Sequence, residues 1–272
     1  MKRASHLLAI DIGNSRAKFG AFPIDHQRSI GSHDTEPATI VARSLDQTSC
    51  LADELLTWWC SLNVPDPVSA VVAGSDPETR EQLTQTWPLT NCPPVVIANH
   101  KQIPVSVDVD VPENVGIDRL LNVFAGGRMF AANRPVIVVD SGTATTVDLM
   151  TSDQTFRGGS ILPGLRLSAY AMHDYTARLP LISVDDEPAE LPDVPGRNTT
   201  DAMRAGLFIG QLGAVRELVN RLATAAADRF GETETPVIVI TGGGGRQLTQ
   251  HLTDAIFIDS LALHGLAMLG QM

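Results

Sequence analysis

The sequence predicts an α/β protein that consists of two similar halves. Apolar runs typical of strands alternate with helical patterns along the chain, and its composition of 43% apolar and 19% charged residues is that of a globular protein. A turn of the form Asp-x-Gly occurs twice, at Asp11 and Asp140, and the spacing of 140 − 11 = 129 is close to half of the 272 residues. We therefore expect two domains, over residues 1–132 and 133–272, with a central cleft between them.

The first half opens with a predicted β-hairpin. Residues 7–10 and 17–22 are apolar runs, and the turn-forming residues from Asp11 to Ser15 separate them. A helix is expected over residues 49–62, because Leu51, Leu55 and Trp58 recur at helical spacing. Beyond it the patterns predict strands over 68–73, 95–98 and 105–109, and helices over 77–87 and 115–132.

The second half repeats the opening pattern. Residues 136–139 form an apolar run that ends at Asp140, and strands are expected over 145–149 and 156–162. The Pro-containing acidic segment 183–197 reads as a surface loop. A long Ala-rich helix follows over 200–229, then a strand over 237–240, the glycines 242–245, and short elements up to the end.

Charge and cysteine usage exclude several classes of protein. The chain has 31 acidic and 20 basic side chains, a net charge of −11, which disfavours a binder of nucleic acid or of anionic membranes. The three cysteines form no C-x-x-C pair, so a structural zinc site is not expected. No run approaches the ~20 apolar residues of a membrane span. We expect a soluble cytoplasmic protein with reduced thiols.

The repeated Asp-x-Gly turn suits a phosphate clamp. Gly13 and Gly142 let the backbone approach an anion, neighbouring N–H and hydroxyl groups donate hydrogen bonds, and each Asp can hold a cation. The alternative is that Asp-x-Gly is only a common hairpin turn. Lys18 lies four residues past Asn14. Its spacing fits a charge beside a phosphate and a solvated strand lysine equally well.

A second motif, Gly116-Ile117-Asp118-Arg119, stands where a helix is expected to begin. Asp118 can serve there as a cap that favours the helix dipole, or as a general base that accepts a proton from a substrate hydroxyl. Arg119 can bind an anionic part of the substrate or pair with Asp118 and orient it. The spacing does not decide between these alternatives.

Together these motifs resemble the type III pantothenate kinases, members of the superfamily of acetate kinase, sugar kinases, Hsp70 and actin. The resemblance covers nearly the whole chain in the family's order. Its motifs here are Asp11-Ile12-Gly13-Asn14-Ser15, Val115-Gly116-Ile117-Asp118-Arg119, Asp140-Ser141-Gly142-Thr143-Ala144-Thr145-Thr146, the Gly158 to Gly164 turn, Gly196-Arg197-Asn198-Thr199-Thr200 and Ile240-Thr241-Gly242-Gly243. It implies two ribonuclease H-like domains of the actin-like ATPase type, and ATP-dependent phosphorylation of pantothenate, the first step toward coenzyme A.

The resemblance also implies roles for individual residues. Asp118 would be the catalytic proton acceptor, Asp140 would bind a monovalent cation, K⁺ or NH₄⁺, and Asp11 would hold Mg²⁺ through water. The homodimer typical of the family is expected as well, and Gly206 and Gly210 of the long helix suit either its close packing or ordinary packing within the chain. The ATP-binding residues would be Asp11, Gly13, Asn14, Ser15, Arg16, Lys18 and Thr143. The substrate-binding residues would be Val109, Gly116, Ile117, Asp118, Arg119 and Thr199.

Two positions depart from the family pattern. Val109 stands where the family usually has a substrate-contacting Tyr, and His264 stands where a Glu is usual. Loss of one phenol hydrogen bond would weaken pantothenate binding by about 1 kcal/mol. Two alternatives follow: a related kinase for another small hydroxylated acid or sugar, and a non-catalytic ATP-binding regulator. The presence of Asp11, Asp118 and Asp140 argues against the regulator.

Overall fold

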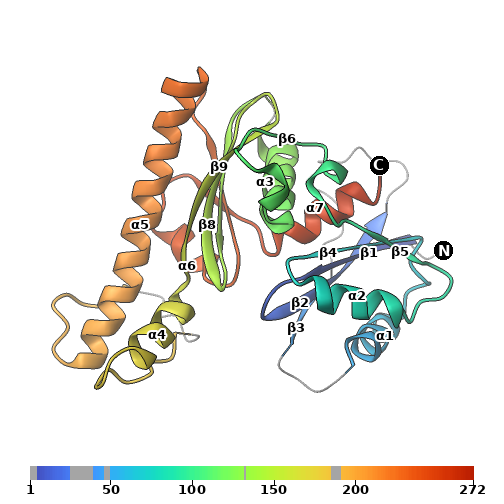
Figure 1. The fold of residues 1–272 in the computed structure, drawn as a ribbon, viewed down its shortest axis with the longest axis horizontal. Coiled ribbons are helices and arrows are strands. Elements are labelled where there is room, and N and C mark those ends of the chain that lie inside the picture. The colour runs from blue at the N-terminus through green and yellow to red at the C-terminus, as the bar shows by residue number, and fades with distance from the viewer. Residues whose placement is uncertain (1–4, 25–38, 46–49, 132, 185–190) are drawn as a thin grey trace. The chain divides into compact units, whose positions relative to one another are not determined.

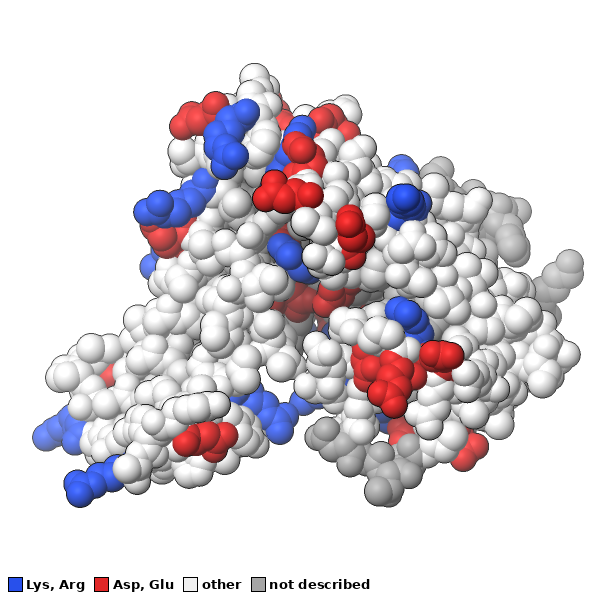
Figure 2. Space-filling model, in the orientation of Figure 1, with Lys and Arg blue, Asp and Glu red and all other residues white. Residues whose placement is uncertain are grey.

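The computed structural model describes residues 5–24, 39–45, 50–131, 133–184 and 191–272, and confirms the α/β class (Figure 1). The chain forms two compact units. Unit 1 comprises Met1–Val105, Asp110–Met129 and Ser260–Met272, and unit 2 comprises Ser106–Val109 and Phe130–Asp259. No helix among the described residues combines the length and the apolar composition needed to cross a bilayer. On the face drawn in Figure 2, basic side chains stand in small groups separated by acidic or uncharged surface.

Unit 1 is built on a mixed five-stranded sheet with the order β3-β2-β1-β4-β5. The central strand β1 pairs antiparallel with β2 and parallel with β4. Its strands are β1 (Ser5–Ile12), β2 (Arg16–Ile24), β3 (Thr39–Ser44), β4 (Ser69–Gly74) and β5 (Pro94–Val96), and its helices are α1 (Leu51–Ser61), α2 (Pro77–Gln85), α3 (Ile117–Phe130), whose last residue passes into unit 2, and α7 (Leu261–Leu269).

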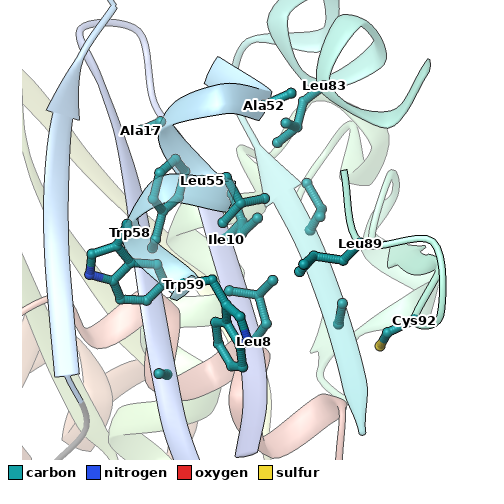
Figure 3. Close-up of a cluster of buried hydrophobic side chains, with 14 of the residues drawn as sticks. Leu8, Ile10, Ala17, Ala52, Leu55, Trp58, Trp59, Leu83, Leu89 and Cys92 are labelled. Atoms are coloured by element: carbon teal, nitrogen blue, oxygen red, sulfur yellow. The ribbon is translucent and has the colours of Figure 1, made fainter. Parts of the chain in front are cut away.

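The two faces of β1 bury different helices, because side chains alternate along a strand. Leu8 and Ile10 face a core formed with α1 and α2, in which Leu55, Trp58 and Leu83 are also buried (Figure 3). Leu7 lies on the opposite face, against α7 and the glycine that ends it, Gly270. Trp87 is half-buried and packs against the edge of the core formed with α1 and α2. A sheet covered on both faces explains why residues 7–10 of β1 form an unbroken apolar run.

Unit 2 is built on a mixed six-stranded sheet with the order β11-β10-β7-β8-β9-β6. The long helix α5 (Thr199–Phe230) buries Leu212, Val215 and Val219 against β7 and β8. The helix α4 (Leu165–Asp174) packs against the first half of α5. The strands are β6 (Ser106–Val107), β7 (Val136–Ser141), β8 (Ala144–Met150), β9 (Thr155–Pro163), β10 (Val237–Thr241) and β11 (Ala255–Phe257), and α6 is Gly245–Gln250.

The structure adds elements that the sequence pattern did not predict. Strand β3 and helix α4 were not expected, and residues 185–190 of the expected loop lie outside the described residues. The boundary expected from the sequence, between residues 132 and 133, divides the chain into two contiguous halves, whereas each compact unit combines separate segments of the chain. The two divisions differ for residues 106–109, 130–132 and 260–272, because β6 pairs with β9 of unit 2 and α7 packs on β1 of unit 1.

Candidate functional site

The first Asp-x-Gly turn joins β1 to β2 at the end of the central strand of unit 1. The amide of Gly13 donates to the carbonyl of Arg16 over 2.9 Å, which closes the turn. Asp11 and Lys18 are directly opposite each other in the register of the antiparallel pair. Asn14 and Arg16 are exposed at the tip. The turn therefore places Asp11 opposite Lys18, next to exposed residues at its tip.

A second loop of unit 1 packs beside this turn. Gly74, the last residue of β4, lies so close to the carbonyl of Ile12 that a Cβ atom would overlap it. Asp76 follows and caps α2: its Oδ1 accepts from the amides of Glu78 and Thr79, and its Oδ2 accepts from the Thr79 hydroxyl over 2.6 Å. These hydrogen bonds, the Thr79 hydroxyl foremost, lower the pKa of Asp76. In the sequence, the only signal for this loop beside the first Asp-x-Gly turn was the pair Asp76-Pro77.

The second Asp-x-Gly turn joins β7 to β8 in unit 2, as the duplication predicts. The amide of Gly142 donates to the carbonyl of Ala144 over 3.0 Å, matching the bond of Gly13 in the first turn. Thr143 is exposed, and its carbonyl accepts from the amide of Gly164 over 3.1 Å. The Pro163-Gly164 turn that ends β9 is thus attached to the predicted nucleotide-binding residue.

The loop after β10 closes around Asp140. Thr241 pairs with Asp140 in parallel register, and Gly242 follows with a φ of +88°. A Cβ atom at Gly242 would lie 2.5 Å from Oδ1 of Asp140 and 2.5 Å from the Ser141 carbonyl oxygen. Only glycine fits this position. The sequence motif Ile240-Thr241-Gly242-Gly243 was noted, but no site role was predicted for Gly242.

Asp118 lies in the first turn of α3, as its motif predicts. Its Oδ1 accepts from the amide of Arg119 over 2.9 Å, and both residues are half-buried. A Cβ atom at Gly116 would lie 2.5 Å from that same Oδ1. The backbone of Gly116 therefore stays within contact of the carboxylate, and one of its oxygens is held by the helix start.

The remaining predicted substrate residues belong to unit 2. Val109 follows strand β6, and its Cγ1 is 3.6 Å from the position of a Cβ atom on Gly158. Thr199 is the exposed first residue of α5, directly after the cap Asn198, whose side chain accepts from the amide of Asp201 over 2.9 Å. His264, the other departure from the family pattern, lies in α7 of unit 1 with its ring 5.2 Å from that of Phe22.

The predicted residues thus form two sets. Unit 1 holds the residues of the first turn, from Asp11 to Lys18, together with Gly116, Ile117, Asp118 and Arg119, whereas unit 2 holds Val109, Asp140, Thr143 and Thr199. Among the described residues, no three or more His, Cys, Asp or Glu side chains gather in a way that could by itself hold a metal ion.

Comparison with known families decides what these motifs belong to. The model of a family described as type III pantothenate kinase matches residues 7–221, which include both Asp-x-Gly turns and Asp118. The chain belongs to the type III pantothenate kinase family. It is accordingly an ATP-dependent kinase of this type.

Individual relatives agree with this assignment. The type III pantothenate kinase of Rubrobacter xylanophilus is 32% identical over 269 residues, covering 97% of this chain and 96% of the relative. A conserved Baf family protein of Campylobacter jejuni has a similar structure, with 19% identity, a TM-score of 0.56 and coverage of 96% of both chains. Component A of (R)-2-hydroxyglutaryl-CoA dehydratase from Acidaminococcus fermentans has 14% identity, a TM-score of 0.52 and 98% coverage of both chains. These structural matches support the expected actin-like fold of the type III pantothenate kinases.

Proposed function

We propose that this kinase transfers the γ-phosphoryl group of ATP to the primary hydroxyl of pantothenate, with Asp118 as the proton acceptor. The observation that carries the proposal is the position of Asp118, a half-buried carboxylate in the first turn of α3, within the motif that the family model matches. One of its oxygens accepts from the Arg119 amide. A carboxylate oriented in this way can accept the hydroxyl proton as the substrate oxygen attacks phosphorus.

The turns would bind the phosphates of ATP. In unit 1, the residues Asp11, Gly13, Asn14, Ser15, Arg16 and Lys18 supply amide, hydroxyl and ammonium donors around one closed turn. In unit 2, Thr143 offers its hydroxyl at an exposed position. Donors that are already ordered stabilise the charge that develops during phosphoryl transfer without having to reorganise.

The chemistry of the Asp turns fits cations that prefer oxygen ligands. Asp140 has the Ser141 carbonyl beside it at the place that a Cβ of Gly242 would fill, so carboxylate and backbone oxygens converge there. We infer that Asp140 would hold the monovalent cation, K⁺ or NH₄⁺, and that Asp11 would hold Mg²⁺ through water. Mg²⁺ would offset the charge on the ATP phosphates.

Pantothenate would be recognised by residues of the Gly116–Arg119 motif together with Val109 and Thr199. Gly116, Ile117 and Arg119 surround the proton acceptor, and the Arg119 guanidinium suits the pantothenate carboxylate. Val109 and Thr199 would provide one apolar and one hydroxyl contact. Since Val109 has no hydrogen-bonding group, a related kinase acting on another small hydroxylated acid stays a second candidate.

The direct test is an assay of the purified protein with ATP, Mg²⁺ and pantothenate, with and without K⁺. We expect phosphopantothenate and ADP in equal amounts, and faster turnover when K⁺ is present. A panel of other small hydroxylated acids and sugars would be measured in parallel. Turnover of one of these but not of pantothenate would replace the proposed substrate, and ATP binding without any turnover would indicate a regulator.

Replacing Asp118 tests its proposed role. Asp118→Asn keeps the size of the side chain but removes the proton acceptor, so we expect kcat to fall by about 10²–10⁴-fold with ATP affinity unchanged. The control is Asp228→Asn, at an exposed position of α5. Steady-state kinetics and calorimetry of ATP binding measure the two effects. Wild-type turnover by Asp118→Asn would remove Asp118 as the base.

We also propose a homodimer that uses the first half of α5. A Cβ atom at Gly206 or Gly210 would meet no described atom within 4 Å, so packing within the described part of the chain does not explain these glycines. Tyr170 and Leu167 of the adjacent α4 are 40% and 47% exposed. Gly206→Leu combined with Gly210→Leu should shift the protein toward monomer in analytical ultracentrifugation. A dimer that persists at wild-type strength would place the interface elsewhere.

The compartment is part of the same proposal. Cys50 and Cys60 are exposed and unpaired, and Cys92 is a buried free thiol whose pKa is raised by burial. Unpaired exposed thiols suit a reducing compartment, so we place the enzyme in the cytoplasm. Reaction of the native protein with a thiol reagent should modify Cys50 and Cys60 before Cys92.

A further inference from the structure

The segment that precedes Val109 is held at the edge of the unit 2 sheet by very few backbone bonds. Strand β6 consists only of Ser106 and Val107, and it pairs with β9. The amide of Ser106 donates to the Gln154 carbonyl over 3.1 Å, and that of Asp108 donates to the Phe156 carbonyl over 3.0 Å. A two-residue strand gains little stability from pairing alone. Its position therefore depends on additional contacts.

Arg157 of β9 supplies them. Its Nη1 donates to Oδ2 of Asp108 over 2.5 Å, its Nη2 to Oδ2 of Asp153 over 3.0 Å, and its Nε to the Thr151 hydroxyl over 3.0 Å. We name Arg157 with these three partners the Arg157 clamp. The guanidinium carbon also lies 4.7 Å from the ring centroid of Phe230, the last residue of α5.

The Arg157 guanidinium is also held by contacts other than the one to Asp108. The Arg157 side chain is 19% exposed, whereas that of Asp108 is 65% exposed. Exposed ion pairs generally contribute little, because two long side chains must be immobilised. Here the bonds to Thr151 and Asp153 and the Phe230 ring already fix the guanidinium, so only Asp108 loses freedom. The hydrogen bonds from Thr151 and Thr155 and the charge of Arg157 lower the pKa of Asp153, so these contacts favour its ionised form.

Val109 follows Asp108 directly, and Gly158 follows Arg157 directly. The clamp therefore acts one residue away from Val109, whose Cγ1 lies 3.6 Å from the place that a Cβ atom on Gly158 would take. Gly158 has a φ of +91°, a backbone conformation that favours glycine and leaves the space beside Val109 open. Because Val109 is the next residue after Asp108, we expect loss of the ion pair to shift Val109 as well.

We propose that Arg157 is a positioning residue for substrate binding, which acts through Asp108 to hold Val109 against Gly158. The inference rests on the proposed function, in which Val109 contacts pantothenate. Since Arg157 and Asp108 touch neither phosphate turn, their loss changes the affinity for the organic acid more than the chemical step. The expected signature is a raised KM for pantothenate with kcat and the KM for ATP nearly unchanged.

The experiment compares variants of the full chain by steady-state kinetics, with pantothenate and ATP varied in turn. Arg157→Met and Asp108→Asn should each raise the KM for pantothenate, by about tenfold for Arg157→Met. The double variant should be no worse than Arg157→Met, because both changes remove the same bond. Arg157→Lys restores a charge without the forked geometry and should recover part of the affinity.

The matched control is Arg221→Met, which removes another arginine–carboxylate pair of unit 2, the exposed 2.7 Å bond from Arg221 to Glu217 on α5. It should leave both KM values unchanged. Equal losses of kcat for both clamp variants, additive effects in the double variant, or a wild-type KM in Asp108→Asn would overturn the proposal. If Arg157→Met does not fold, Asp108→Asn decides alone, since it leaves the other bonds of Arg157 in place. Absence of pantothenate turnover by the wild type would instead overturn the proposed function.

Discussion

Gly242 shows how a single residue can determine the geometry around Asp140. Its φ of +88° and the 2.5 Å separation of a Cβ position from Oδ1 of Asp140 exclude any side chain. We expect Gly242→Ala to lower the free energy of unfolding by about 1–3 kcal/mol and to reduce activity sharply, because strain and overlap both arise beside Asp140, the proposed cation ligand.

The neighbouring glycine provides the control for this prediction. A Cβ at Gly243 would meet no described atom within 4 Å, so Gly243→Ala should change the free energy of unfolding by less than about 0.5 kcal/mol. Chemical denaturation and pantothenate turnover would be measured for both variants. Equal effects of the two substitutions would show that the contact with Asp140 is not the cause.

At this scale the sequence predicted residue types better than residue contacts. Asp11, Asp118 and Asp140 could be selected because each stands at the end of an apolar run or at a helix start. The contact of Gly242 with Asp140 could not be predicted, because 242 − 140 = 102 residues separate the two. In a run of four glycines, the sequence also does not indicate which one adopts a positive φ. The Arg157 clamp was missed for the same reason: its partner Asp108 is 157 − 108 = 49 residues away.

At the scale of elements, helix α2 owes its start to Asp76. Because the Asp76 carboxylate accepts from two amides and the Thr79 hydroxyl, Asp76→Ala should lower the free energy of unfolding by about 1 kcal/mol. The cap residue of α1, Cys50, makes no such side-chain bond, so Cys50→Ala should change stability by less than about 0.5 kcal/mol. Thermal or urea unfolding of the two variants checks the difference.

The same cap predicts a pH dependence. The pKa of Asp76 is lower in the folded than in the unfolded state, chiefly through the Thr79 hydroxyl, so folding favours the ionised form. The stabilisation is complete above the ordinary aspartate pKa of about 4 and is lost as the pH falls through the lowered folded pKa. The difference between wild type and Asp76→Ala should therefore shrink below about pH 4. A difference that stayed constant as the pH fell well below 4 would mean that the hydrogen bonds do not depend on charge.

Elements with one strong pattern could be predicted, and elements defined by their partners could not. Strands β1 and β7 are buried apolar runs, and α5 is a long helical pattern closed by Gly231. Strand β3 has no buried residue and exists because it pairs with β2. Helix α4 has a single buried residue, Ala169, so its burial against α5 left little trace in the sequence.

At the scale of the whole molecule, the last residues of the chain complete the first unit. Helix α7 buries Leu261, Leu263 and Leu266, and a Cβ at Gly265 would lie 2.7 Å from the Leu121 carbonyl oxygen. Deletion of residues 260–272 should expose the α7 face of β1 and unfold unit 1 while the core of unit 2 persists.

Amide hydrogen exchange would resolve this outcome by element. Protection should disappear from β1 and β4 but remain in β7 and β8. Deletion of only Gln271 and Met272, which are exposed, is the control and should leave both units protected. Protected β1 amides in the longer deletion would show that α7 is dispensable for unit 1. The pattern of the last residues predicted only short elements, because nothing local to them indicates which sheet they cover.

The core of unit 1 also has an optical consequence. Trp58, Trp59 and Trp87 all belong to unit 1, and both tyrosines, Tyr170 and Tyr175, belong to unit 2. Selective excitation of indole therefore reports on unit 1 of the unlabelled enzyme. A stopped-flow record of indole fluorescence during refolding would time the assembly of unit 1, without any introduced dye.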